Sequence, residues 1–153
     1  MDAKLTNLGR MQFVGVADSG HEVSIDGRLE VGGDDSAVHP MELIALGLGG
    51  CTAMDVLSIL RKKRQAVEAF EVRLHLDRAE EYPKVFTRAV ITYEVRGSAL
   101  EEAAVRRAIE LSALKYCPAQ AMLSKAFPIE YRYILLDTTG ALLKEGTWEP
   151  QLA

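Results

Sequence analysis

The chain has 153 residues, of which 48% are apolar and 26% are charged, and its formal net charge at neutral pH is -4. This length and mix are typical of globular proteins, so we expect one domain over residues 1–153 with a substantial buried core. The mild negative charge gives no reason to expect nucleic acid or an anionic membrane as a partner.

The first ten residues hold no apolar stretch of signal-peptide length, and the longest apolar stretch, residues 43–51, is too short to span a bilayer. We therefore expect a cytoplasmic protein that is not inserted in a membrane. Two cysteines, Cys51 and Cys117, are too few for a disulfide scaffold. In a reducing compartment they are core residues, metal ligands or redox-active thiols.

The first half of the chain predicts three short strands, a loop and a long helix. The strands are expected at residues 4–8, 11–16 and 22–25, separated by turn sequences, and a glycine-containing loop follows at 31–37. Pro40 then suits the first turn of a helix over residues 41–60. This helix is apolar nearly all round, which is typical of a buried helix.

The next segment predicts a half-solvated antiparallel sheet. Residues 70–76 and 88–95 alternate between apolar and polar side chains, the pattern of strands with one face in the core. Residues 80–84 between them are expected to form a hairpin loop.

The last third of the chain predicts an amphipathic helix over about 99–115, with Ser98 as a candidate cap. Pro118 interrupts that helix, and a short helix to residue 126 is expected to follow. A final strand at 129–136 leads into a tail at 137–153.

The resulting order of elements, β-β-β-α-β-β-α-β, indicates an α+β fold built from antiparallel strands, with a core from about residue 3 to 136. A helix as apolar as 41–60 needs cover on several sides, and one small sheet covers only one. We therefore expect a second subunit to supply the remaining cover.

The two cysteines have different settings. Cys51 lies in the apolar helix, where a lone cysteine is most often a small core residue. Cys117 stands at the helix break before Pro118, where unpaired backbone N–H groups favour a thiolate. The chain has no C-x-x-C and its three histidines are scattered, so the spacing of a structural zinc site is missing. We expect neither a metal nor another cofactor.

Three motifs together resemble those of the osmotically inducible protein C / organic hydroperoxide resistance family. They are HPMEL at 39–43, GLGGCTAMDV at 47–56 and KYCP at 115–118. The order of elements from residue 3 to 136 is similar to that family as well, and the similarity is greatest to its less characterised branch.

The resemblance implies an intertwined homodimer, in which two long central helices pack together with sheets around them and active sites lie at the subunit interface. It also suggests a reason for three glycines in a helix, Gly47, Gly49 and Gly50. Without side chains they let another backbone or a substrate approach Cys51 closely. Plain helix packing is the alternative explanation.

The resemblance further implies a redox reaction of the two thiols. Cys51 would reduce an organic hydroperoxide and become a sulfenic acid, and Cys117 would then form a disulfide with it. A dithiol reductant, lipoyl-linked in better-known members, would restore both thiols.

The sequence departs from the better-known branches at the residues that activate the first cysteine. Those branches place a glutamate directly after the helix-leading proline and pair it with an arginine. Here Met41 has that place and the acid is Glu42, about 100° further round the helix. Arg28, or less favourably Arg10, is the candidate arginine.

A third candidate supporting residue is Asp55, one turn beyond Cys51, with a backbone group or a basic residue of the second subunit as its expected partner. Three functions stay open on these residues. One is a thiol-dependent hydroperoxide reductase of the antioxidant and stress-response kind. The second is a dimer without efficient peroxidase activity that binds a small apolar ligand or exchanges thiols. The third is an interaction protein that keeps only the scaffold.

Overall fold

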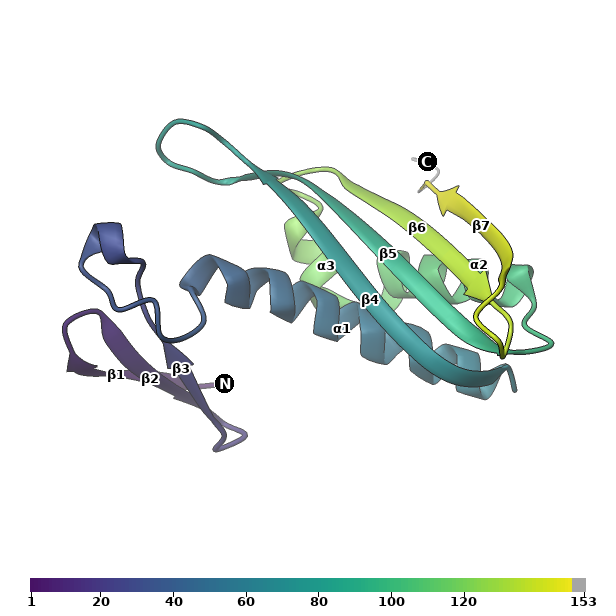
Figure 1. Ribbon diagram of the computed structural model, residues 1–153, viewed down its shortest axis with the longest axis horizontal. Coiled ribbons are helices and arrows are strands. Elements are labelled where there is room, and N and C mark those ends of the chain that lie inside the picture. The colour runs from purple at the N-terminus through teal and green to yellow at the C-terminus, as the bar shows by residue number, and fades with distance from the viewer. Residues whose placement is uncertain (150–153) are drawn as a thin grey trace. The chain divides into compact units, whose positions relative to one another are not determined.

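The computed structural model describes residues 1–149, and this part of the chain folds as two compact units, Met1–Leu46 and the residues from Gly47 onward (Figure 1). The boundary falls inside the long helix α1 (Pro40–Lys62), which begins in the first unit and continues through the second.

The N-terminal unit contains a three-stranded antiparallel sheet. Its strands are β1 (Ala3–Gly9), β2 (Gln12–Ala17) and β3 (Glu22–Ile25), in the order β1-β2-β3. The three strands expected from the sequence are thus confirmed, with ends that move by at most one residue for the first two. Turn sequences limit each strand to a few residues, so the sheet stays small.

A buried carboxylate organises the loop that joins β3 to α1. Asp26 is 1% exposed. Its two oxygens accept hydrogen bonds from the backbone N–H groups of Gly27 at 2.7 Å, Asp34 at 3.1 Å and Ser36 at 3.0 Å, and from the Ser36 hydroxyl at 2.8 Å. The Ser36 backbone bond is the main reason why the pKa of Asp26 lies below its usual value. The loop expected at 31–37 is therefore an ordered structure that includes a short 3-10 helix, η1 (Leu29–Val31).

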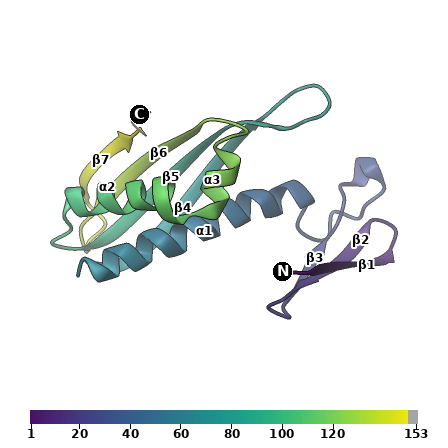
Figure 2. The same ribbon diagram turned by 180° about the vertical axis from the view of Figure 1, so that it is seen from behind.

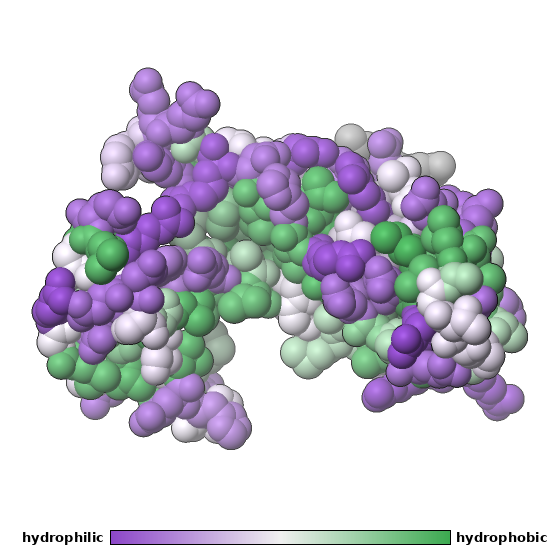
Figure 3. Space-filling model, viewed as in Figure 1, coloured by the Kyte–Doolittle hydropathy of each residue, from purple (hydrophilic) through white to green (hydrophobic). Residues whose placement is uncertain are grey.

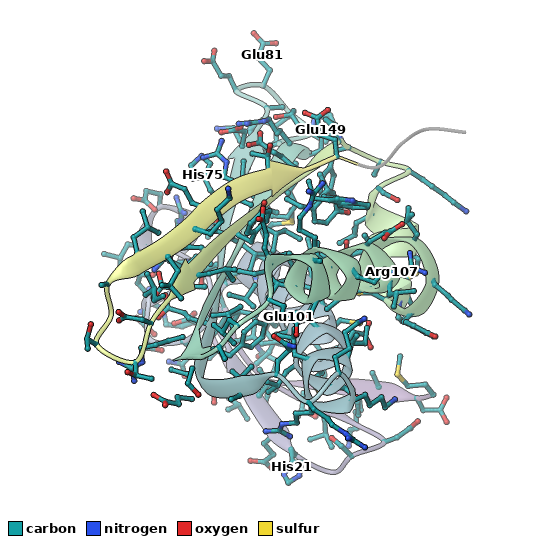
Figure 4. All side chains as sticks on the ribbon, turned by 90° about the vertical axis from the view of Figure 1, so that its right-hand side faces the viewer. His21, His75, Glu81, Glu101, Arg107 and Glu149 are labelled. Atoms are coloured by element: carbon teal, nitrogen blue, oxygen red, sulfur yellow. The ribbon has the colours of Figure 1, made fainter. Side chains whose placement is uncertain are left out.

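The second unit contains a four-stranded sheet in the order β4-β5-β6-β7. Its strands are β4 (Ala66–Arg78), β5 (Phe86–Ser98), β6 (Ile129–Leu136) and β7 (Leu142–Trp148). The hairpin of β4 and β5 is antiparallel, as expected. Figure 3 shows the loop at its end as a hydrophilic projection, and Figure 4 places Glu81 on it.

The sheet differs in two ways from the one expected from the sequence, in which all strands were antiparallel and the last strand was at 129–136. First, β5 and β6 are parallel, because the chain crosses over through helices between them and returns to the same end of the sheet. Second, the tail expected after residue 136 contains β7, which pairs antiparallel with β6. Most of β7 is exposed, so its sequence lacks the apolar alternation that predicts a strand.

The crossover consists of α2 (Glu102–Leu111), a π-helical segment η2 (Ser112–Tyr116) and α3 (Pro118–Leu123). The break before Pro118 is confirmed. The expected cap at Ser98 is wrong, because Ser98 ends β5 and Glu101 stands at the N-cap instead, without a side-chain cap bond. Between them, Ala99 has a φ of 52° and turns the chain from the strand into the helix.

Within the second unit, the helices lie on one face of the four-stranded sheet, as the two opposite views in Figures 1 and 2 agree. Figure 4 shows His75 on the outer side of the sheet and Arg107 on the outer side of α2. The apolar core fills the layer between. Its fully buried members include Val56 and Leu60 of α1, Ile91 and Tyr93 of β5, and Ile109 of α2.

Helix α1 is not buried on all sides within one chain. Met54, near its middle, is 72% exposed, although Val56 is fully buried. The helix is also longer than the apolar stretch seen in the sequence, and it is the one helix of residues 1–149 that by length and composition alone could cross a membrane. Leu48, Val56 and Leu60 of this helix pack in the core cluster of the second unit.

Candidate functional site

The fold brings the two cysteines together. Cys51 is carried by α1 and is partly exposed, whereas Cys117 lies between η2 and α3 and is 2% exposed. Both are free thiols, and Cys51 is near enough to Cys117 to contribute to the raised pKa of the Cys117 thiol. The site therefore places one accessible thiol beside one enclosed thiol, from segments far apart in the chain.

Cys117 is held by the backbone on both sides. Its N–H donates to the carbonyl of Ser112 at 3.0 Å, and its Sγ accepts from the backbone N–H of Gln120 at 3.4 Å, which makes it the N-cap of α3. Burial is the main reason why the pKa of Cys117 rises to about 11, and the neighbouring Cys51 adds to the rise. The bond from Gln120 acts in the opposite direction but does not cancel it.

This backbone arrangement depends on the π-helical segment. A π-helix bonds each N–H to the carbonyl five residues earlier, and Cys117 bonds to Ser112 in that way. Pro118 then takes the first position of α3, where a missing N–H is no loss. The segment that the sequence predicts as a simple helix break is a wider turn that positions the Cys117 sulfur.

Beneath the thiols lies a buried network of polar side chains from four elements. The Thr52 hydroxyl is 2.6 Å from the hydroxyl of Tyr93 and 3.0 Å from that of Ser112. The Gln120 amide Nε2 donates to the hydroxyls of Thr52 at 2.7 Å and Ser112 at 3.2 Å. Thr52, Ser112 and Gln120 are all 0% exposed.

The network ends at Asp55, which the sequence marks as a candidate supporting residue. The Ser112 hydroxyl donates to Asp55 Oδ2 at 3.3 Å. The partner of this carboxylate is therefore a serine of the same chain, rather than the backbone group or basic residue expected. Asp55 is joined to the Cys117 segment through Ser112.

Glu42 and Arg28, the other supporting candidates, belong to the N-terminal unit. Glu42 accepts a hydrogen bond from the backbone N–H of His39 at 3.0 Å, and this bond is the main reason why its pKa is lowered. The charges of His39 and Arg28 lower it further. Glu42 thus caps the start of α1, as an acid in the first turn does. An activating role of Glu42 or Arg28 toward Cys51 stays a prediction.

Arg10, the weaker candidate, pairs with Asp34 and also donates to the carbonyl of Gly33 at 3.3 Å. It therefore stabilises the ordered loop after β3. His39, expected as a loop residue before the helix, binds Asp35 through Nε2 at 2.7 Å.

The three glycines near Cys51 have different surroundings. A Cβ added to Gly49 would lie 2.6 Å from Cδ1 of Leu74 on β4, so this glycine allows α1 to approach the sheet closely. A Cβ added to Gly47 or Gly50 would meet no atom within 4 Å. Packing inside the chain explains Gly49, and the other two leave backbone accessible beside the cysteine.

Sequence reasoning missed four residues of the site: Thr52, Tyr93, Ser112 and Gln120. One signal was available, because Ser112 and Thr52 are polar residues on helix faces that are otherwise apolar. A buried hydroxyl needs a partner, so two such positions flanking the cysteines indicate a shared network. Gln120 carries no comparable signal, since a glutamine in a short helix is usually solvated.

A surface groove of about 570 Å³ lies beside the Cys117 end of the site. Its lining includes the apolar side chains of Leu114 and Ile129, the ring of Tyr131, and the charged side chains of Arg88, Glu130 and Glu149. Burial, and to a lesser extent the nearby Cys117, raises the pKa of Tyr131, so this ring connects the groove to the cysteine. Residues 1–149 contain no group of three or more side chains suited to a metal ion.

Two neighbouring free thiols, one in the middle of a long helix and one at the start of a short helix, place this α+β protein among small proteins with a cysteine pair. A family model described as OsmC-like protein matches residues 33–132, most of the chain, and the chain belongs to that family. This confirms the resemblance seen in the sequence motifs.

Individual relatives agree with this assignment. Protein YhfA of Escherichia coli K12 is 42% identical over 133 residues, which cover 87% of this chain and 96% of the relative. A crystal structure of a hypothetical protein from Aquifex aeolicus VF5 is similar with a TM-score of 0.78 at 29% identity, over 89% of this chain and 96% of that one. An organic hydroperoxide resistance protein from Legionella pneumophila has the same fold, with a TM-score of 0.59 at 18% identity over 85% and 93% of the two chains.

Proposed function

We propose that this protein is a thiol-dependent reductase of organic hydroperoxides that works as a homodimer. The observation that carries the proposal is a partly exposed Cys51 that neighbours the enclosed Cys117. A peroxidase of the two-cysteine kind needs that asymmetry, because the first thiol meets the substrate and the second must wait until it is oxidised.

The reaction would proceed in three steps: oxidation of Cys51, formation of the disulfide and its reduction. The Cys51 thiolate attacks the outer oxygen of the hydroperoxide, the O–O bond breaks, and the alkoxide leaves as an alcohol after taking a proton. Cys117 sulfur attacks the resulting sulfenic acid, the S–S bond forms, and the S–O bond breaks. The hydroxide leaves as water with the Cys117 proton. A dithiol reductant restores both thiols and becomes a disulfide itself.

The raised pKa of Cys117 suits the second role. A thiol whose pKa is about 11 stays protonated at neutral pH, so it does not compete with Cys51 for the peroxide. It reacts only with the sulfenic acid formed beside it, where proximity compensates for its small thiolate fraction.

The test is turnover of an organic hydroperoxide and of hydrogen peroxide with dihydrolipoamide as reductant. We expect Cys51→Ser to abolish turnover, and Cys117→Ser to stop it after one equivalent of peroxide while leaving Cys51 oxidation intact. Because the lining of the groove beside Cys117 includes Leu114, Ile129 and Tyr131, the organic substrate should react faster. A Cys51→Ser variant with the wild-type rate would refute the proposal.

A second function is favoured by the residues at the start of α1. Met41 stands where better-known members carry their activating glutamate, while Glu42 is engaged by His39 and Arg10 by Asp34. A dimer without efficient peroxidase activity, which binds a small apolar ligand or exchanges thiols, needs no activating pair. Negligible peroxide turnover, together with rapid exchange of the Cys51–Cys117 pair with a glutathione buffer, would support this second function.

A further inference from the structure

Each cysteine has two polar residues nearby in the chain, and hydrogen bonds between their side chains join the two cysteine-bearing segments. Thr52 and Asp55 follow Cys51 on α1, at the next position and one turn on. Ser112 and Gln120 bracket Cys117, and their backbone groups are the ones that bind its N–H and its sulfur. The side chains of these same two residues bind Thr52.

The hydrogens of this network can be assigned from its geometry. The Ser112 hydroxyl donates its one proton to Asp55, so the Thr52 hydroxyl must donate to Ser112. Thr52 then accepts from Tyr93 and from Gln120 Nε2. Burial raises the pKa of Tyr93, which keeps its phenol protonated as the donor that this order requires.

Every donor of the network is thereby used, and one acceptor is left over. Gln120 Oε1 is buried and has no hydrogen-bond partner within residues 1–149. Turning the amide would place Oε1 against Thr52 and Ser112 and would remove the two bonds that Nε2 donates to them. A buried carbonyl without a hydrogen-bond partner is unfavourable. The two hydrogen bonds that Nε2 donates offset this cost of burying Gln120.

We propose that Thr52, Ser112 and Gln120, anchored by Asp55, form a positioning network that sets the distance between the two thiols and so determines how readily Cys51 and Cys117 form a disulfide. The network fixes the backbone of the Cys117 segment against α1, one residue from Cys51. This inference rests on the proposed function for its peroxide step, but the pairing of the thiols can be measured without peroxide.

The experiment is the equilibrium of the full chain with glutathione, in which two protein thiols and one glutathione disulfide give a protein disulfide and two glutathione thiols. The equilibrium constant measures the effective concentration of one thiol at the other. We expect Thr52→Val and Ser112→Ala to lower it by about tenfold or more, because each removes a hydroxyl that joins the segments. Thr52→Ser, which keeps the hydroxyl, should stay within about threefold of the wild type.

Val56→Ala is the matched control, since Val56 lies on the same buried face of α1 and its truncation destabilises the fold without touching the network. It should lower the unfolding midpoint and leave the equilibrium constant within about threefold. If Thr52→Val does not fold, Gln120→Met replaces it. Equilibrium constants of Ser112→Ala and Gln120→Met within threefold of the wild type would overturn the proposal.

A second readout separates the network from the first chemical step. After one equivalent of cumene hydroperoxide, Ser112→Ala should lose the Cys51 thiol at the wild-type rate but yield more dimedone-labelled sulfenic acid, because disulfide closure is slow. Equal labelling of both proteins would count against the network. If wild-type Cys51 does not react with the peroxide at all, the proposed function fails, and the glutathione equilibrium still decides the positioning role.

Discussion

At the scale of single residues, the glycines next to Cys51 have separable roles. Gly49 lies against Leu74, where an added Cβ would be 2.6 Å from a side-chain carbon, while Gly50 faces open space within the chain. Both lower the intrinsic stability of α1 by roughly 0.8–1.0 kcal/mol relative to alanine. Only at Gly49 is this loss offset within the chain, because the missing side chain allows α1 to pack closely against β4.

We therefore expect Gly49→Ala and Gly50→Ala to have opposite effects on the unfolding of the chain. Gly49→Ala forces Leu74 to move, and such overpacking costs about 1–3 kcal/mol, which outweighs the gain in helix propensity. Gly50→Ala gains up to about 1 kcal/mol. Urea denaturation at concentrations low enough to keep the chain monomeric measures both. Equal free energies of unfolding for the two variants would contradict the structure.

At the scale of elements, the loop between β3 and α1 depends on one carboxylate. Asp26 binds three backbone N–H groups and a hydroxyl, and these bonds lower its pKa. A carboxyl whose pKa is lower in the folded state stabilises the fold above its unfolded pKa, and this stabilisation is lost as the pH falls through the folded value. The loop should therefore be sensitive to acid.

We expect Asp26→Asn to have a lower urea midpoint than the wild type at pH 7. The difference between the two midpoints should shrink as the pH falls below about 4, because Asp26 of the wild type then becomes protonated as well. Loss of hydrogen-exchange protection at the backbone N–H groups of Asp34 and Ser36 locates the effect. Asp18→Asn, at an exposed carboxylate of the same unit, is the control and should change little. A difference between wild type and Asp26→Asn that is constant from pH 7 to 2 would contradict this account.

At the scale of the whole molecule, the chain exposes apolar surface that a monomer would be expected to bury. In the N-terminal sheet, Leu5 is 60% and Leu8 is 63% exposed, and on α1 Met54 is 72% exposed. A three-stranded sheet with no apolar layer of its own is marginal in water. The proposed homodimer accounts for both, since a second copy would cover the sheet and the free side of α1.

We expect the wild type to be a dimer at micromolar concentration by analytical ultracentrifugation, and Met54→Lys to weaken it by about thirtyfold or more, because a buried unpaired charge costs at least about 2 kcal/mol. Val85→Lys is the control, since Val85 is 51% exposed on the loop between β4 and β5. A wild type that sediments as a monomer, or a Met54→Lys dimer as tight as the control, would rule out an interface on this side of α1.

Much of the architecture was predictable from local patterns. The period-two alternation of residues 70–76 and 88–95 predicted β4 and β5, and the apolar run after Pro40 predicted α1. The motifs around Cys51 and Cys117 predicted the family, which is confirmed. The cap at Ser98 and the antiparallel pairing of the last core strand were wrong, because strand length and crossover path depend on contacts that no local window contains.

The sequence by itself determined most of the elements, the position of each cysteine along the chain and the family, because helix and strand periodicity and short motifs are properties of neighbouring residues. It did not show β7 or the π-helical segment. The tertiary structure alone decided that Cys117 is enclosed beside Cys51, that Thr52, Ser112 and Gln120 join their two segments, and that Asp55 binds Ser112. These are hydrogen bonds and burial between residues far apart in the chain, and they exist only after the sheet and the helices have packed.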